Sequence, residues 1–208
     1  MKSNLNMIFV FGFIIQISLL KITAQTRNDS TFVKEIIKTR QTKDTLFLSA
    51  HSPLEKKDIE EFKGLKYFAI NPEYKVDAIF KKNKKPKSFK MKTSTERLPV
   101  YLVYGTIEFT ISGQKFILNV YQSKDLLRKP GLENYLLIPF TDETSGNETY
   151  GGGRFLDFTI PKSEIVNIDF NLAYNPYCAY SHKFSCPIPP KENHLKIKIE
   201  AGEKVFKE

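Results

Sequence analysis

From Tyr67 onward the chain alternates short apolar segments with turn residues, and strands and helices do not alternate regularly. A parallel, doubly wound sheet requires regular alternation of strands and helices, so that fold is excluded. The pattern predicts a mainly β (α+β) fold with a single antiparallel sheet, strongly curled into a barrel-like or sandwich-like shape. The eight strand-like segments are Tyr67–Ile70, Tyr74–Phe80, Val100–Ile111, Lys115–Tyr121, Tyr135–Phe140, Arg154–Phe158, Ile165–Phe170 and His194–Glu200.

One or two N-terminal helices are expected before these strands. Ser30 or Thr31 can cap a helix that ends near Asp44, with the apolar residues 32, 36 and 37 on one face. Ser52-Pro53-Leu54-Glu55 has the pattern of a capping box with proline at the first helical position. This motif predicts a second, short helix that starts there.

The first 24 residues have the composition of a secretory signal peptide. A basic start precedes the apolar run Met7–Leu20, and Ala24 supplies a small residue for cleavage. As a helix, that run would be about 21 Å long, short of a hydrocarbon core of about 30 Å. A cleaved leader is therefore favoured over a retained anchor. We expect an exported protein, periplasmic or secreted, in which residues 25–208 form one β-rich domain without a transmembrane span.

The net charge of +9 is concentrated in one segment. Residues 1–24 carry Lys2, Lys21 and no acid, so the rest of the chain has a net charge of +7. Lys81–Lys92 contains seven lysines and no acid, which accounts for all of that excess. A nucleic-acid-binding face usually draws its basic residues from several elements, so no nucleic-acid partner is expected. The segment is either a solvated hairpin that resists edge-to-edge pairing or a contact for acidic polysaccharide or anionic lipid.

Cys178 and Cys186 are the two cysteines of the chain. In an exported protein, so close a pair predicts a disulfide. A metal site is the rival interpretation, because His182 lies between them and His194 follows. The flanking prolines disfavour a helix that would align these side chains, and the spacing differs from that of structural zinc sites. We expect a disulfide and no metal, with free thiols as the third possibility.

Three consecutive glycines before Arg154 suggest an anion-binding loop, since backbone amides and a guanidinium can hold an oxyanion. The chain lacks the glycine patterns of nucleotide-binding loops, and a strand rather than a helix follows. A close approach of this backbone to a strand or a ring is the alternative. Asp142, Asp157 and Asp169 lie near strand ends, where carboxylates form turns or act as an acid–base pair.

Two motifs of the chain resemble signatures of an uncharacterised bacterial family, domain-of-unknown-function family DUF1684. The first comprises residues 138–142 (IPFTD) and 149–156 (TYGGGRFL). The second comprises residues 169–180 (DFNLAYNPYCAY) and 185–190 (SCPIPP). Residues 52–54 and 62–68 are similar to the family's opening. The resemblance implies a small β-rich domain and attributes no activity to it.

A binding or structural module for a small polar ligand or an envelope component is the favoured function, and no cofactor is expected. Aromatic, amide and glycine residues gather in two loops, where binding sites are often built. The alternative is a hydrolase acting on an anionic or sugar-like substrate, with Asp142 and Asp169 as acid and base and Arg154 holding the substrate. Convergence of the candidates on one cavity would indicate a ligand site, and dispersal a scaffold. The candidate ligand-binding residues are Tyr150, Gly151, Gly152, Gly153, Arg154, Asn171, Tyr174, Asn175 and Tyr180.

Overall fold

The computed structural model describes residues 30–207. The chain divides into two compact units, one ending at Thr42 and the other beginning at Lys43. The signal peptide expected at residues 1–24 lies outside the described residues. Within them, no helix is both long enough and apolar enough to cross a membrane.

Residues 30–47 are helical, so the predicted helix is present and ends a few residues beyond Asp44. Phe32 and Ile36 are buried, whereas Ile37 is exposed, so the apolar face is narrower than expected. The hydroxyl groups of Thr39 and Thr42 donate to backbone carbonyls four residues earlier, at 3.0 and 2.9 Å. These bonds keep two β-branched polar side chains within the helix.

In the second unit the expected second helix starts later than predicted. Helix α2 is Lys56–Ile59, and its N-cap is Glu55 rather than Ser52. The Ser52 hydroxyl instead accepts a hydrogen bond from the Leu54 amide at 3.2 Å, which closes a turn before the helix. The side chain of Glu55 makes no capping hydrogen bond, because its carboxylate binds Ser181 and Lys183 instead. The capping-box prediction was therefore wrong in position, although a short helix does follow.

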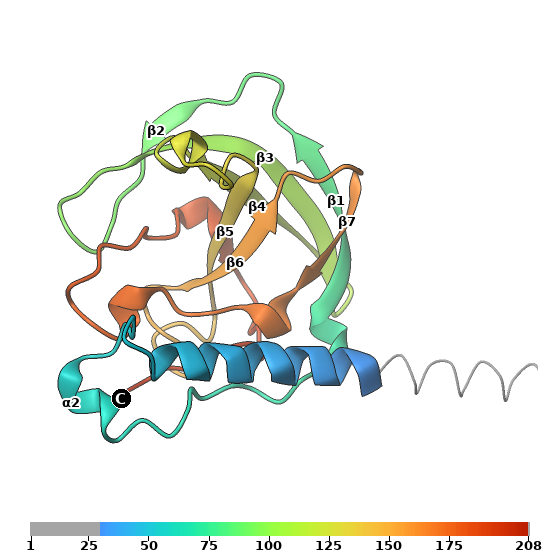
Figure 1. Cartoon of the computed structure of the whole chain (residues 1–208). Coiled ribbons are helices and arrows are strands. Elements are labelled where there is room, and N and C mark those ends of the chain that lie inside the picture. Colours follow the sequence, from blue (N-terminus) through green and yellow to red (C-terminus); the bar gives the residue numbers. More distant parts are fainter. Residues whose placement is uncertain (1–29, 208) are drawn as a thin grey trace, which may run out of the picture. The chain divides into compact units, whose positions relative to one another are not determined.

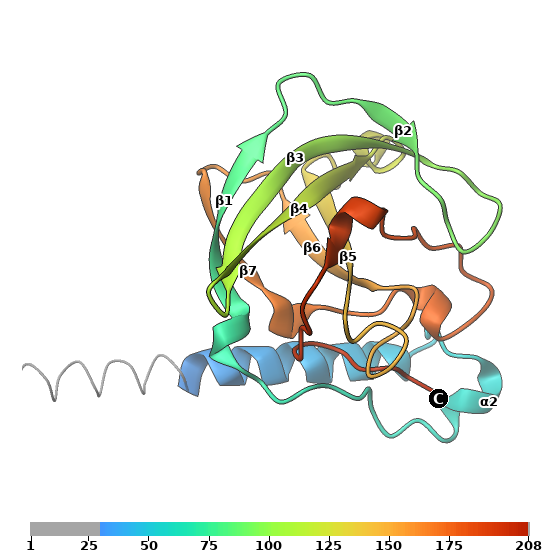
Figure 2. The same ribbon diagram turned by 180° about the vertical axis from the view of Figure 1, so that it is seen from behind.

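The second unit contains the single curled antiparallel sheet that the sequence predicts (Figures 1 and 2). Its strand order is β6-β5-β4-β3-β1-β7, with β2 paired to β3 and β8 paired in parallel to β5. The path folds the sheet into a half-barrel. The strands are β1 Lys75–Lys82, β2 Ser88–Lys90, β3 Val100–Ile111, β4 Gln114–Ser123, β5 Tyr135–Asp142, β6 Arg154–Thr159, β7 Ile165–Asp169 and β8 His194–Leu195.

Two of the predicted strands are largely irregular. Tyr67–Ile70 contributes an isolated bridge between Tyr67 and Glu203. The strand predicted at His194–Glu200 is regular only over its first two residues. Apolar residues of this C-terminal segment are buried nonetheless, because Leu195, Ile199 and Ala201 belong to the main core. In residues 194–200 the alternation of apolar and polar residues therefore reflects the burial of alternate side chains. The backbone of this segment forms few strand-pairing hydrogen bonds.

A bulge in β3 contributes to the curl of the sheet. The pairing of β3 with β4 shifts register between Val103 and Gly105. A side chain at position 105 would begin 2.6 Å from the Lys81 carbonyl oxygen and 2.9 Å from the Phe80 ring. Glycine is therefore required for β1 to pass this close, and bulges increase local twist and bend a sheet.

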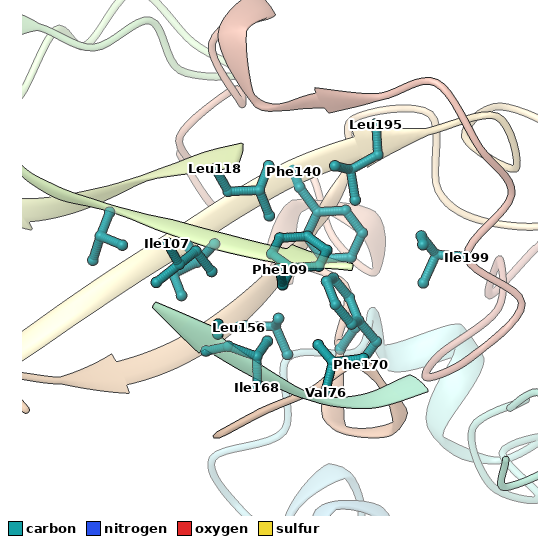
Figure 3. Close-up of a cluster of buried hydrophobic side chains, with 14 of the residues drawn as sticks. Val76, Ile107, Phe109, Leu118, Phe140, Leu156, Ile168, Phe170, Leu195 and Ile199 are labelled. Carbon is teal, nitrogen blue, oxygen red and sulfur yellow. The ribbon is translucent and has the colours of Figure 1, made fainter. Parts of the chain in front are cut away.

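The concave face of the sheet holds the main apolar core (Figure 3). Phe109, Phe140 and Phe170 meet at its centre, with ring centroids 5.4 Å apart in both contacts of Phe170. A second cluster lies on the opposite face, because neighbouring strand residues point to opposite sides of a sheet. Its buried members are Met91, Tyr101, Tyr121, Leu137 and Phe155.

Candidate functional site

Arg154 is fully buried, with no exposed surface. It begins β6, opposite Phe140 of β5, and its guanidinium lies over the Phe140 ring. Nη2 donates to the Asp142 carboxylate at 3.1 Å and to the Ile199 carbonyl at 2.9 Å. Nη1 donates to the Ala201 carbonyl. The guanidinium thus ties β5 and β6 to the C-terminal segment.

The Asp142 carboxylate is also bound by internal partners. Its carboxylate accepts from the Thr144 hydroxyl at 2.8 Å and from the Ile199 amide at 2.7 Å, besides Arg154. Burial lowers the pKa of the Arg154 guanidinium, and the Asp142 carboxylate opposes that shift. A buried charge is tolerated only when it is paired and hydrogen-bonded, and this pair meets both conditions. An external anion would have to displace these internal partners to reach Arg154.

Replacing Arg154 with methionine should lower the free energy of unfolding by about 3–5 kcal/mol, because the Asp142 carboxylate loses its buried counter-charge. Urea unfolding monitored by circular dichroism would measure the loss. Adding Asp142→Asn to that variant should restore part of it. Exposed Arg128 is the control, and Arg128→Met should change stability by less than about 0.5 kcal/mol. A loss below about 1 kcal/mol for Arg154→Met would show that the pair is not a structural support.

The glycine run makes room for close packing of the backbone. Gly153 has φ of 85°, in the left-handed region that favours glycine. A side chain there would begin 2.6 Å from both the Phe140 carbonyl oxygen and the Pro189 ring. Gly152 lies against the ring of Tyr150, and Gly151 is exposed. The three glycines therefore allow a close approach of the backbone to a strand and a ring, which was the alternative to an anion-binding loop.

Gly153→Ala should destabilise the protein by about 1–3 kcal/mol more than Gly131→Ala. Both glycines have nearly the same φ, 85° and 83°, but nothing lies within 4 Å of a side chain placed at Gly131. The difference between the two variants isolates the steric clash from the backbone strain. Thermal or urea unfolding of both would measure it. Equal losses would mean that the loop can move away from Phe140 and Pro189.

Asn175 and Tyr180 surround Glu203, a residue that the sequence reasoning missed. The Glu203 carboxylate is 1% exposed and accepts from the Lys43 ammonium at 2.6 Å and the Asn175 amide at 3.2 Å. The Tyr180 hydroxyl donates to it as well. Burial raises the pKa of the Glu203 carboxyl, and Lys43 opposes that shift. In the sequence, Glu203 is one of several charged residues near residue 200, so no sequence pattern predicts that it is buried.

Asn171 and Asp169 form a third network. The Asn171 amide group exchanges two hydrogen bonds of 2.9 Å with the backbone of Asn71. Asp169 accepts from the Asn171 backbone and side chain, also at 2.9 Å, and caps the short 3₁₀ turn Phe170–Leu172. Asp142 and Asp169, the acid and base of the hydrolase hypothesis, therefore bind different partners in separate networks.

Tyr174 lies on the opposite face of the sheet, where its hydroxyl donates to Asp157 at 2.5 Å. The hydroxyl of Tyr135 donates to the same carboxylate oxygen at 2.7 Å. Burial and the negative charge of Asp157 raise the pKa of both tyrosines, so they stay protonated donors. Lys43 covers Tyr174, with its ammonium 4.8 Å from the ring centre. Asp157 joins β5, β6 and the Tyr174 segment at one exposed carboxylate.

Cys178 and Cys186 are neighbours and both are free thiols in the structure. The Cys178 amide lies 3.2 Å from the Cys186 sulfur, and the Tyr150 hydroxyl lies 3.6 Å from the Cys178 sulfur. The expected pairing partner is therefore in place, while the covalent bond stays a prediction. Among residues 30–207 no group of three histidine, cysteine or acidic side chains could hold a metal ion. His194 binds Thr141 and Glu143 instead.

The polar candidate residues bind several different sets of internal partners. An open hollow of about 350 Å³ lies at β1, β3 and β4, away from all of them. Its lining residues are Val76, Asp77, Ile79, Glu108, Phe109, Thr110 and Lys115. The six predicted residues with polar side chains are instead divided among the networks of Arg154, Glu203, Asn171, Asp157 and the two cysteines. By the criterion set from the sequence, dispersal of this kind is typical of a scaffold.

Comparison with known proteins identifies the family. Residues 60–204 match the family described as "Protein of unknown function (DUF1684)". The chain belongs to the DUF1684 family. An uncharacterised protein of Haloarcula marismortui, solved by NMR in solution, is 33% identical and superposes with a TM-score of 0.65. The match covers 86% of this chain and 96% of that one. No curated protein matches this DUF1684 chain.

Proposed function

We propose that this DUF1684 protein is an exported binding module of the cell envelope, and that its contact surface is the lysine segment, residues 81–92. All seven lysines of the segment are exposed. Lys81 is paired with Glu108 at 3.3 Å, and among residues 30–207 no salt bridge is found for the other six. An excess of one charge sign that is not neutralised internally is available to attract an oppositely charged partner.

The lysine segment is fixed to the sheet at several points. Strand β2 pairs with β3. The Asn83 side chain donates to the Val103 carbonyl at 2.8 Å, and the Val103 amide donates to the Lys87 carbonyl at 3.1 Å. Figure 1 shows the connection from β1 to β2 projecting beyond the strands. The lysines therefore extend from an anchored backbone, which reduces the ordering cost of binding.

An anionic lipid surface is the partner that fits the residue type best. The segment contains no arginine, so it cannot form the planar, bidentate contacts that read a particular anionic group. Lysines instead respond to the density of negative charge, and each contributes about 1 kcal/mol near an anionic leaflet. Acidic polysaccharide is the competing partner.

The internal networks weigh against a small polar ligand at the two predicted loops. Arg154, Asn171, Asn175 and Tyr180 are all buried and bound to other parts of the same chain. The hydrolase alternative has no support from the geometry either, because Asp142 is enclosed with Arg154. Binding through an exposed surface therefore accounts better for the features of this chain than catalysis does.

Replacing Lys84, Lys85, Lys87 and Lys90 with glutamine should weaken binding to phosphatidylglycerol-containing vesicles by about tenfold or more. Co-sedimentation of the mature chain would measure the affinity, and vesicles of phosphatidylcholine alone should not bind it. Added salt should weaken the interaction because the charges are exposed.

The matched control is a variant with four exposed lysines elsewhere replaced by glutamine, Lys63, Lys129, Lys162 and Lys191. It changes the net charge equally and should keep most of the binding. Equal losses in the two variants would mean that net charge alone drives the association. Binding to soluble polygalacturonate but not to anionic vesicles would replace the lipid by a polysaccharide partner.

Export should remove residues 1–24, so the mature protein should begin at Gln25. Expression of the full chain in a Gram-negative host, followed by fractionation and intact mass measurement, would test this. Ile14→Arg interrupts the apolar run and should leave the uncleaved chain in the cytoplasm, whereas Ile14→Leu should be processed normally. A cytoplasmic wild-type protein that retains its first residues would contradict the proposed localisation.

A further inference from the structure

Beyond the proposed function, we infer that Cys178, Cys186 and Tyr150 form a thiol–disulfide exchange site, in which Cys178 attacks an external disulfide and Cys186 resolves the product. Both cysteines lie within the second family motif, and Tyr150 lies within the first. The site needs no buried residue to become exposed. The three side chains come from two loops that the sequence analysis singled out for other reasons.

The two sulfurs are held next to each other by the backbone. Cys178 lies in the 3₁₀ turn Tyr177–Ala179, and its amide donates to the Cys186 sulfur at 3.2 Å. Cys186 is fixed from the other side by Ser94, whose hydroxyl accepts from the Cys186 amide at 3.1 Å. The Ser94 amide in turn donates to the Cys186 carbonyl at 2.9 Å. A bond between the sulfurs can therefore form without a large rearrangement.

The two cysteines differ in access. Cys186 is buried, with 8% of its surface exposed, whereas Cys178 is only partly buried. Of the two residues, Cys178 is therefore the better placed to meet an external reagent. Cys186 can attack only a group that is already attached to its neighbour. This is the arrangement expected of an attacking and a resolving thiol.

Hydrogen bonds to the Cys178 sulfur favour its thiolate form. The Cys186 thiol and then the Tyr150 hydroxyl lower the pKa of Cys178, to about 6, against the opposing effect of burial. The pKa of Cys186 is raised, because its thiol proton is held in a hydrogen bond to the Cys178 sulfur and burial disfavours its thiolate. At neutral pH the accessible sulfur is thus the nucleophile, and the buried sulfur keeps its proton.

The exchange is balanced with a low-molecular-weight disulfide as oxidant. The Cys178 thiolate attacks one sulfur of that disulfide, so a mixed disulfide forms and one thiolate leaves. Cys186 then loses its proton to that leaving thiolate or to water and attacks the Cys178 sulfur. The internal disulfide forms, and the second thiolate leaves. The charge of Arg97 favours the Cys186 thiolate required in this step. The product is the disulfide that the sequence predicts.

Alkylation of the reduced, full-length mature protein with limiting iodoacetamide would test the assignment. Peptide mapping should show Cys178 labelled at least tenfold faster than Cys186 at pH 7. The rate at Cys178 should rise with pH through a midpoint near 6. Tyr150→Phe removes one hydrogen-bond donor, so it should move that midpoint to higher pH while leaving the rate at high pH unchanged. Tyr177→Phe is the control in the same loop and should leave the midpoint in place.

Oxidised glutathione would test the exchange itself. The wild-type protein should form the internal disulfide, and Cys186→Ser should accumulate a glutathione adduct at Cys178. If that variant fails to fold, the peptide mapping of the alkylated wild-type protein still tests which cysteine is the nucleophile. Equal labelling of both cysteines, or an internal disulfide that excess reduced glutathione cannot open, would overturn the proposal. Neither result would bear on vesicle binding by the lysine segment.

Discussion

The buried pair of Arg154 and Asp142 is the interaction on which much of the architecture depends. It connects the ends of β5 and β6 to the backbone of Ile199 and Ala201. Those C-terminal residues form almost no ladder bonds of their own, because β8 contains two residues only. Side-chain hydrogen bonds to their carbonyl and amide groups supply what a strand would otherwise provide. The pair thus closes one end of the half-barrel and covers the aromatic core.

The sheet could be predicted from the sequence because its signals are local. Alternation of apolar residues in β1 and the turn between β3 and β4 each depend on neighbours in the chain. The irregular segments were harder. Residues 194–200 alternate like a strand, yet they are held by Arg154 and Asp142, which lie far away in sequence. A periodicity read over a few neighbouring residues carries no information about a partner that is distant in the sequence.

The candidate site was predicted less well for a related reason. A glycine run followed by arginine can bind an external anion or an internal carboxylate, and the amino-acid sequence is the same in both cases. The choice depends on whether Asp142 faces Arg154, which is a property of the β5–β6 pairing. Glu203 shows the converse, since a surface-like acid is buried among residues 43, 175 and 180. The two sequence motifs of this chain are therefore, in large part, sites of internal polar contacts.

The distance along the chain between the closing contacts has a consequence for folding. Ile199 and Ala201 lie 45 and 47 residues beyond Arg154, whose guanidinium binds both of their carbonyls. Until this segment docks, Arg154 lacks two of its acceptors and the aromatic core lacks its cover. Docking must close a long loop before it makes these contacts, so we expect it to be a late step of folding.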